Sequence, residues 1–518
     1  MAVNDLIIFG VDAADFDVLD SPDVDLPTFD RLMDTGVAAD LESTLPPITG
    51  AAWPSMACGR GPNSTGMFDF VNFSREQHQE YRPSPDKVDP FWSYLFEVGY
   101  RVGISGFPLA PLDTPVDGFV LSWPWYLPED EQRLSPPDFF DNTDIVVDDY
   151  IRPNTEFDFD RVMRDLEDKI EFDERVLAEF DFDVYYTYLD ADTTIHMTKT
   201  DDKERLHEVY RTIDEGMDRM LSHCDDDCAA MVVSDHGFSE VWGHFHIDQF
   251  LHDNGHLSLD RSGGQATVQR TGLPRLVQPM KEFAKKSGIA DIVRPYLDDQ
   301  ETRQTLGLRF DLELDDVDWE DTFVVNSGNW GQLYDLTADR DSIDEVIEQI
   351  DRLASAQGFD VEVRDPAEEY GTTDLHPDCP DAVVTIRKDG QTVLHSSSMT
   401  SVETDDEEYF EQIDPHLDQG EIGVFIASGP EFAVGETVDG FHLTDLAPTI
   451  LTYFEGTIPP ELDGTAQSHI YDSESHLSGL SPEIGFLYLY EQMIDDGASR
   501  QRDVEEVKEK LSHLGYFE

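Results

Sequence analysis

Apolar residues occur along the chain in two patterns, as short continuous runs and as runs with helical spacing. Short apolar runs at residues 6–11, 184–189 and 229–234 predict buried strands, because a strand covered on both faces has no polar side. Apolar positions spaced three and four apart predict amphipathic helices at residues 26–36 and 159–180. Since strand and helix signals alternate throughout, we predict an α/β fold with a mostly parallel central sheet and helices on both faces.

The character of the chain changes between residues 259 and 365. We interpret 259–365 as an inserted cap region, which divides the core α/β domain into a first part, 1–258, and a second part, 366–518. A group of basic residues stands in this region of an otherwise acidic chain. It either attracts an anionic substrate or forms a solvated face that pairs with nearby carboxylates. The basic residues are Arg270, Arg275, Lys281, Lys285, Lys286 and Arg294.

The composition of the 518 residues is strongly acidic. There are 35 Lys and Arg residues against 111 Asp and Glu, a formal net charge of -76, yet 39% hydrophobic and 11% aromatic residues indicate a folded protein rather than a disordered one. Because dense surface carboxylates repel one another less when salt screens them, we interpret the protein as adapted to high salt. The same charge should repel nucleic acid and anionic membranes, so we expect neither as a partner, and the sequence does not fix an oligomeric state.

The cysteine content and the N-terminal sequence indicate the cellular location of the protein. Four cysteines in so long a chain do not make a disulfide framework. The start, MAVNDLIIFGVDAADFD, lacks the basic region of a signal peptide, and no apolar run reaches the length of a membrane span. We therefore expect a cytoplasmic, reducing location.

The segment STLPPITGAAWPSMACGRG offers one hydroxyl, that of Thr49, where extended chain turns into a predicted helix. Pro46 and Pro47 favour an extended approach, and Gly50 lets a bulky group come close to the backbone. The free N–H groups and the positive dipole end of a helix N-terminus favour a phosphate there. The alternative is that Thr49 only caps the helix, a role for which threonine is well suited.

Acidic and histidine residues follow all three apolar runs. Asp12 ends the first, Asp192 and His196 follow the second, and Asp235 and His236 follow the third. Since the carboxyl ends of parallel strands meet at one edge of a sheet, these side chains could converge on divalent cations such as Zn²⁺ or Mn²⁺. Alternatives remain: a helix cap or turn residue for the first, and an ordinary surface pair for the second group.

Together these residues resemble one family. Asp12, Thr49, the pair Asp192 and His196, and SDHG at residues 234–237 are similar to the alkaline phosphatase superfamily, in its type I phosphodiesterase/nucleotide pyrophosphatase branch, which includes archaeal and bacterial proteins labelled phosphohydrolase or phosphomutase. The resemblance covers most of the chain and extends to IASGPEF and LTDLAPTIL. It implies an alkaline-phosphatase-like fold.

The resemblance also implies two divalent metal ions as cofactors, zinc in the first place and manganese as the alternative. Two cations a few ångströms apart can stabilise both the attacking and the leaving oxygen of a displacement at phosphorus. The resemblance assigns one metal to Asp192, His196 and His416, and the other to Asp12, Thr49, Asp235 and His236.

Two positions limit how far the resemblance carries. His416 is chosen because it precedes the IASGP strand, and His244, His246 and His442 remain alternatives. In the nucleotide pyrophosphatases an Asn soon after the nucleophile helps to bind a phosphate oxygen, but Ala52 stands there in this chain. A different group must bind that oxygen, or the substrate differs.

The implied activity is hydrolysis of a small phosphorylated substrate, a phosphodiester or a nucleotide-like pyrophosphate. A threonine hydroxyl bound to a cation loses its proton readily, so Thr49 would attack phosphorus and form a phosphothreonine that water then hydrolyses. One alternative is a phosphomutase, which transfers the phosphoryl group within a small metabolite. Another is a catalytically silent protein of the same fold that binds cations or a partner.

Overall fold

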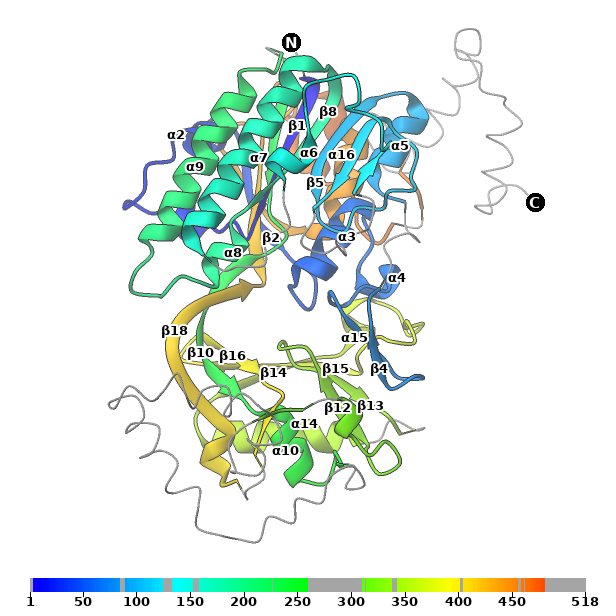
Figure 1. Ribbon diagram of the computed structural model, residues 1–518, viewed down its shortest axis with the longest axis vertical. Helices are drawn as coiled ribbons and strands as arrows, with labels where there is room; N and C mark the ends of the chain where they lie inside the picture. The colour runs from blue at the N-terminus through cyan, green and yellow to red at the C-terminus, as the bar shows by residue number, and fades with distance from the viewer. Residues whose placement is uncertain are drawn as a thin grey trace, which may run out of the picture.

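The chain folds into two lobes, each built on its own sheet (Figure 1). The structure is a computed structural model that describes residues 3–83, 89–123, 133–151, 158–225, 227–259, 310–312, 314–337, 342–400, 404–454, 458–460 and 462–479. The predicted basic group at residues 270–294 lies outside these residues. We call the lobe with the nine-stranded sheet the first lobe and the lobe with the seven-stranded sheet the second lobe.

The sheet of the first lobe has the strand order β20-β2-β19-β9-β1-β8-β5-β6-β7. Its middle strands, from β9 to β6, all run parallel, whereas β19 and β7 run antiparallel to their neighbours. The predicted α/β fold with a mostly parallel sheet is confirmed. The strands are β1 Val3–Asp12, β2 Gly36–Glu42, β5 Arg101–Phe107, β6 Asp117–Ser122, β7 Leu134–Ser135, β8 Phe182–Asp190, β9 Ala229–Val233, β19 Ile422–Ser428 and β20 Glu436–His442.

Helices cover both faces of this sheet (Figure 1). One group, α2, α7 and α9, packs together on one face, and α3, α5 and α16 pack together on the other. Both predicted amphipathic helices are present, and each ends within two residues of its predicted end. The helices are α2 Pro27–Asp34, α3 Thr49–Cys58, α5 Phe91–Val98, α7 Phe159–Glu179, α9 Glu204–Leu221 and α16 Leu446–Tyr453.

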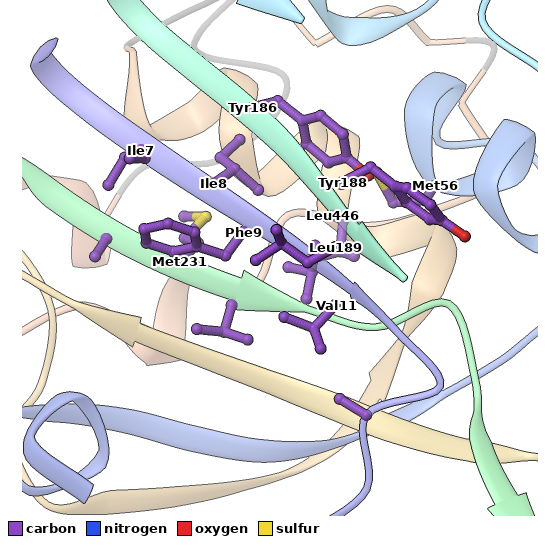
Figure 2. Close-up of a cluster of buried hydrophobic side chains, with 14 of the residues drawn as sticks. Ile7, Ile8, Phe9, Val11, Met56, Tyr186, Tyr188, Leu189, Met231 and Leu446 are labelled. Atoms are coloured by element: carbon purple, nitrogen blue, oxygen red, sulfur yellow. The ribbon is translucent and has the colours of Figure 1, made fainter. Parts of the chain in front are cut away.

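Strand β1 runs through the centre of the core. Figure 2 shows its side chains among those of β8, β9, α3 and α16, and the apolar residues at positions 6–11 are fully buried. The parallel registers place Asp12 opposite Asp190 on β8, and Gly10 opposite Val233 on β9. Because these three strands end in register, the polar residues that follow each of them emerge at the same edge of the sheet.

The sheet of the second lobe has the order β12-β13-β15-β16-β10-β18, with β14 paired to β15. It takes strands from both sides of residues 259–365, and the predicted boundaries at 259 and 365 stay a prediction. Its strands are β10 Gly237–Phe245, β12 Val324–Ser327, β13 Gln332–Asp335, β14 Asp360–Arg364, β15 Ala382–Lys388, β16 Gln391–His395 and β18 Phe410–Gly420, and its helices are α10 Ile247–Asp253 and α14 Ser342–Ala356.

Two long strands, β10 and β18, pair antiparallel and join the two lobes (Figure 1). Strand β10 begins at Gly237, directly after the residues that follow β9, and β18 ends at Gly420, just before β19. The ribbon of these two strands therefore starts at the sheet edge where β1, β8 and β9 end. The sequence did not predict a strand at residues 410–420, because FEQIDPHLDQG is mostly polar and contains a proline.

A second connection between the lobes comes from the segment that follows α3. The Gln332 side chain on β13 donates a hydrogen bond to the carbonyl oxygen of Phe68 at 3.3 Å. The Arg75 guanidinium donates to the Asp381 carboxylate at 2.6 Å. The segment after α3 is therefore held against the second lobe.

The remaining short helices and strands of both lobes are α1 Phe16–Leu19, α4 Pro62–Thr65, β3 Asn72–Ser74, β4 Gln79–Tyr81, α6 Val147–Tyr150, α8 Asp192–Ile195, β11 Phe310–Asp311, α15 Pro366–Glu369 and β17 Ser398–Met399.

Candidate metal centre

Asp12, the last residue of β1, is fully buried at the carboxyl edge of the first sheet. Its Oδ2 accepts hydrogen bonds from the Tyr188 hydroxyl at 2.6 Å and from Trp53 Nε1 at 3.2 Å. Its Oδ1 has no hydrogen-bond partner among the described residues. Burial, and then the negative charge of Asp192, raise the pKa of Asp12 to about 7. One carboxylate oxygen is thus held by the protein, and the other is left for a ligand.

Asp235 and His236 follow β9 and are also fully buried. Nδ1 of His236 lies 2.8 Å from the Gly237 carbonyl oxygen, so Nδ1 donates its proton there and Nε2 keeps a lone pair. Burial lowers the pKa of His236, which favours the neutral ring. Asp235 Oδ1 accepts from the backbone N–H of Ala13 at 3.4 Å, while Oδ2 has no hydrogen-bond partner among the described residues and lies 3.3 Å from His236 Nε2.

Thr49 is the first residue of α3, and its side chain is fully buried beside this pair. The N-cap position belongs to Ile48, in extended conformation, so Thr49 does not cap the helix. Instead, Thr49 Oγ1 lies 3.0 Å from His236 Nε2. Gly50 is needed for close packing within the chain, because a Cβ there would lie 2.7 Å from the backbone nitrogen of Phe70.

These residues form one cluster with the donor chemistry of a divalent cation site. Ligand atoms of Asp12, Asp235 and His236 all lie within 4.8 Å of one another. Burying two carboxylates side by side is costly without a compensating positive charge, and Asp12 and Asp235 each keep one buried oxygen with no hydrogen-bond partner among the described residues. Two carboxylates, one neutral imidazole nitrogen and one hydroxyl therefore fit a bound Zn²⁺ or Mn²⁺.

Asp192 and His196 form a neighbouring group at the short helix α8, where His196 is the C-terminal cap residue. His196 Nε2 lies 3.4 Å from Asp192 Oδ2, and Asp192 Oδ1 lies 4.0 Å from His236 Nε2, so the two groups are adjacent. Burial opposes ionisation of Asp192, but the nearby His196 and a hydrogen bond from the Gln419 side chain leave its pKa lowered. Burial likewise opposes protonation of His196, but the charges of Asp192 and Asp418 raise its pKa to about 9.

His416 lies within β18, opposite Val241, and is half-buried. Its Nδ1 lies 3.4 Å from the Asp414 carbonyl oxygen, and its backbone forms an isolated antiparallel bridge with Lys199, three residues after His196. The role predicted for His416 stays a prediction. The β18 side chain next to His196 is that of Asp418, whose Oδ2 lies 3.7 Å from His196 Nδ1.

Two of the alternative histidines are engaged elsewhere. His246 Nε2 lies 3.0 Å from a Glu411 oxygen in the second lobe. His442, at the end of β20, lies 3.1 Å from a Glu42 oxygen on β2. His244 stands on β10 opposite Glu411.

Three residues at the site escaped sequence reasoning, namely Asp418, Tyr188 and Trp53. Asp418 does not stand out in the sequence because aspartate is so abundant in this chain. It lies two positions after His416, so the two side chains share one face of the strand. Tyr188 and Trp53 resembled ordinary core residues. Trp53 stands directly after Ala52, and it donates to a candidate metal ligand rather than to a phosphate oxygen.

Comparison with known proteins identifies a family and similar folds. Residues 6–418 match the family described as type I phosphodiesterase/nucleotide pyrophosphatase. No curated protein matches the sequence. Similar solved structures include human ectonucleotide pyrophosphatase/phosphodiesterase 5, the murine protein, and an inactive murine variant with threonine replaced by alanine, in complex with AMP. Each is 13% identical with a TM-score of 0.50, over 90% of this chain and 100% of that chain, which supports the alkaline-phosphatase-like fold.

The match covers far more than half of the chain, and the cluster at the sheet edge lies inside the matched residues. The chain therefore belongs to the type I phosphodiesterase/nucleotide pyrophosphatase family of the alkaline phosphatase superfamily, and it is a phosphoric ester hydrolase.

Proposed function

We propose that this protein is a two-metal phosphohydrolase that cleaves a phosphodiester or a nucleotide-like pyrophosphate, with Thr49 as the nucleophile. The observation that carries the proposal is the position of the Thr49 hydroxyl, 3.0 Å from His236 Nε2 and beside two buried carboxylates. A buried hydroxyl at the start of a helix, next to groups that suit a cation, has the surroundings of an activated nucleophile. The family and the AMP complex of a structural relative support a nucleotide-like substrate.

The residues divide into two candidate cation sites. Asp12, Thr49, Asp235 and His236 would hold one cation, and Asp192 and His196 would hold the other, with His416 as the further ligand predicted from the family resemblance. Zinc is our first choice and manganese the alternative. Bound divalent cations supply positive charge that lowers the pKa of a bound hydroxyl and neutralises charge developing on phosphate oxygens.

The chain's own groups then account for the displacement. Thr49 Oγ1 would lose its proton to solvent and attack phosphorus, forming a phosphothreonine, while the bond to the leaving oxygen breaks and that oxygen takes up a proton from solvent. The N-terminus of α3 presents the positive end of its dipole to the phosphoryl group. Tyr188 and Trp53 keep Asp12 in one orientation through hydrogen bonds to its Oδ2. Attack of water on the phosphothreonine restores the hydroxyl and releases phosphate or a phosphomonoester.

We further propose that the protein works in the cytoplasm at high salt. The support is a net charge of -76 and four cysteines that are all free thiols. Among the described helices, none combines the length and the apolar character that crossing a membrane requires.

The test is a comparison of Thr49→Ala with Thr49→Ser in molar salt, with zinc or manganese added and with diester, monoester and nucleotide substrates. The alanine variant should lose turnover by at least about 10³-fold and still bind cations, whereas the serine variant keeps a hydroxyl and measurable turnover. Near-normal activity of Thr49→Ala would remove Thr49 from the nucleophile role. Release of phosphate or a monoester, rather than formation of an isomer, separates the hydrolase from a phosphomutase with the same site.

A further inference from the structure

Strand β18 of the second lobe passes directly beside helix α8 of the first. The backbone N–H of Leu417 donates to the carbonyl oxygen of Thr198, just after α8, at 3.1 Å. This contact holds the next residue, Asp418, against His196. The Asp418 side chain is only 11% exposed. Its Oδ1 accepts from the backbone N–H of Gln419 at 2.8 Å, and its Oδ2 lies 3.7 Å from His196 Nδ1.

The imidazole of His196 thus lies between two carboxylates. Nε2 is 3.4 Å from Asp192 Oδ2, and Nδ1 is 3.7 Å from Asp418 Oδ2. When a cation binds one nitrogen of this ring, the imidazole is neutral, with one N–H and one lone pair, so only one of its two nitrogens can face the cation and the other carries the proton. With the proton on Nδ1, the ring donates toward Asp418, and the Nε2 lone pair points toward Asp192. The opposite tautomer would turn the lone pair toward Asp418 and leave no nitrogen ligand beside Asp192.

We propose that Asp418 is a positioning residue: its carboxylate, at ion-pair distance from Nδ1 of His196, favours the tautomer protonated at Nδ1 and thereby directs Nε2 to the cation held with Asp192. This inference rests on the proposed two-metal function. A histidine ligand commonly donates its other N–H to a carboxylate or a carbonyl, which fixes the tautomer and increases the basicity of the ring.

The tautomer of His236, a candidate ligand of the other cation, is fixed by a backbone group instead of a side chain. His236 Nδ1 lies 2.8 Å from a backbone carbonyl oxygen, that of Gly237 in its own chain segment. Of His196 and His236, His196 is the one whose Nδ1 faces a side chain, and that side chain comes from a strand of the second-lobe sheet. A substitution of Asp418 should therefore weaken one cation site and leave the cluster of Asp12, Asp235 and His236 intact.

The experiment compares Asp418→Leu and Asp418→Asn with wild type and with Asp414→Asn, a change at an exposed position of the same strand. Cations bound per chain are measured in molar salt by equilibrium dialysis against graded Co²⁺, together with the visible absorption of bound Co²⁺. Wild type and Asp414→Asn should bind two Co²⁺. Asp418→Leu should bind the first normally and the second about 10–100-fold more weakly, and its turnover should recover as Co²⁺ is raised.

Asp418→Asn keeps an acceptor oxygen, so its loss of affinity should be smaller than that of Asp418→Leu. Far-UV circular dichroism checks that each variant is folded. If Asp418→Leu does not fold, the affinity of Asp418→Asn for the second Co²⁺ is the measurement that decides. Unchanged affinity for the second Co²⁺ in both variants would overturn the positioning role of Asp418 and leave the proposed two-metal function standing. Complete loss of the second Co²⁺ in both would indicate a direct ligand and overturn the positioning role. Fewer than two Co²⁺ in wild type would overturn the two-metal function as well.

Discussion

Thr49 Oγ1 and His236 Nε2 lie 3.0 Å apart, although 187 residues separate them along the chain. Their contact depends on the order of strands in the first sheet, where β9 lies next to β1. His236, three residues after the end of β9, and Thr49, the first residue of α3, thus meet at the edge where Asp12 ends β1. This meeting of distant segments is the basis of the predictions that follow.

Asp235→Asn should lower both cation content and turnover. The amide removes one of the two buried negative charges at the cluster, and an amide oxygen is a weaker ligand than a carboxylate for Zn²⁺. We expect loss of about one cation per chain, measured by elemental analysis after dialysis, with at least about 10²-fold lower kcat/KM at limiting zinc. Asp25→Asn, on the exposed surface, is the matched control and should change neither quantity. A full cation complement in Asp235→Asn would exclude Asp235 as a ligand.

Lys169→Met should strongly destabilise the first lobe. Lys169 Nζ lies 2.5 Å from Asp173 Oδ2 one turn further along α7, and both side chains are buried. Removing the cation leaves the Asp173 carboxylate buried without its ion-pair partner, a change that costs about 3–5 kcal/mol. The measurement is urea unfolding in molar salt at constant zinc.

The double variant Lys169→Met, Asp173→Leu is the control for this pair, because it removes both charges. It should recover much of the lost stability. Equal stability of wild type and Lys169→Met would show that the ion pair adds nothing to the free energy of unfolding.

Acid should destabilise the protein partly through His395. This residue is buried in the second lobe, its ring 5.5 Å from that of Phe245, and burial lowers its pKa from 6.5 to about 3 against the opposing effect of a hydrogen bond with the Val384 backbone. Between these two pH values the unfolded chain binds the extra proton, so the free energy of unfolding falls as pH falls. The contribution of His395 to the free energy of unfolding is fully present above about pH 6.5. About 1.4 kcal/mol of this contribution is lost by about pH 5.5.

His395→Leu isolates this effect, since leucine has a similar volume and does not titrate. Urea unfolding at about pH 7.5 and about pH 5.5 should show a smaller acid-induced loss in the variant than in wild type, by about 1.4 kcal/mol. The same loss in both proteins would mean that His395 does not titrate differently on unfolding.

The sequence predicted those features that local pattern determines. The apolar runs of β1, β8 and β9 are buried on both faces, so each run marks its strand and the polar residue after it. The parallel registers then bring Asp12, Asp235 and His236 together, as the strand ends indicated. Lys169 and Asp173 show the limit of such patterns, because a Lys and an Asp four residues apart look like a surface pair but are buried here.

The surroundings of His196 could not be predicted, because they depend on long-range pairing. Residues 410–420 form a strand only by pairing with β10, and the register is interrupted between the pairs at His416 and Gln412. The pairing of residues 416–420 with β10, and the bond from Leu417 N–H to the Thr198 carbonyl oxygen, bring this end of β18 beside α8, and no local periodicity of the sequence indicates either contact. The structure places Asp418 there.

The ribbon of β10 and β18 has a structural consequence. Strand β10 leaves the edge of the first sheet immediately after His236, and β18 returns to that edge through Asp418, so one end of the ribbon lies beside the candidate metal ligands. The backbone that follows His236 and the backbone that carries Asp418 therefore both belong to the sheet of the second lobe as well.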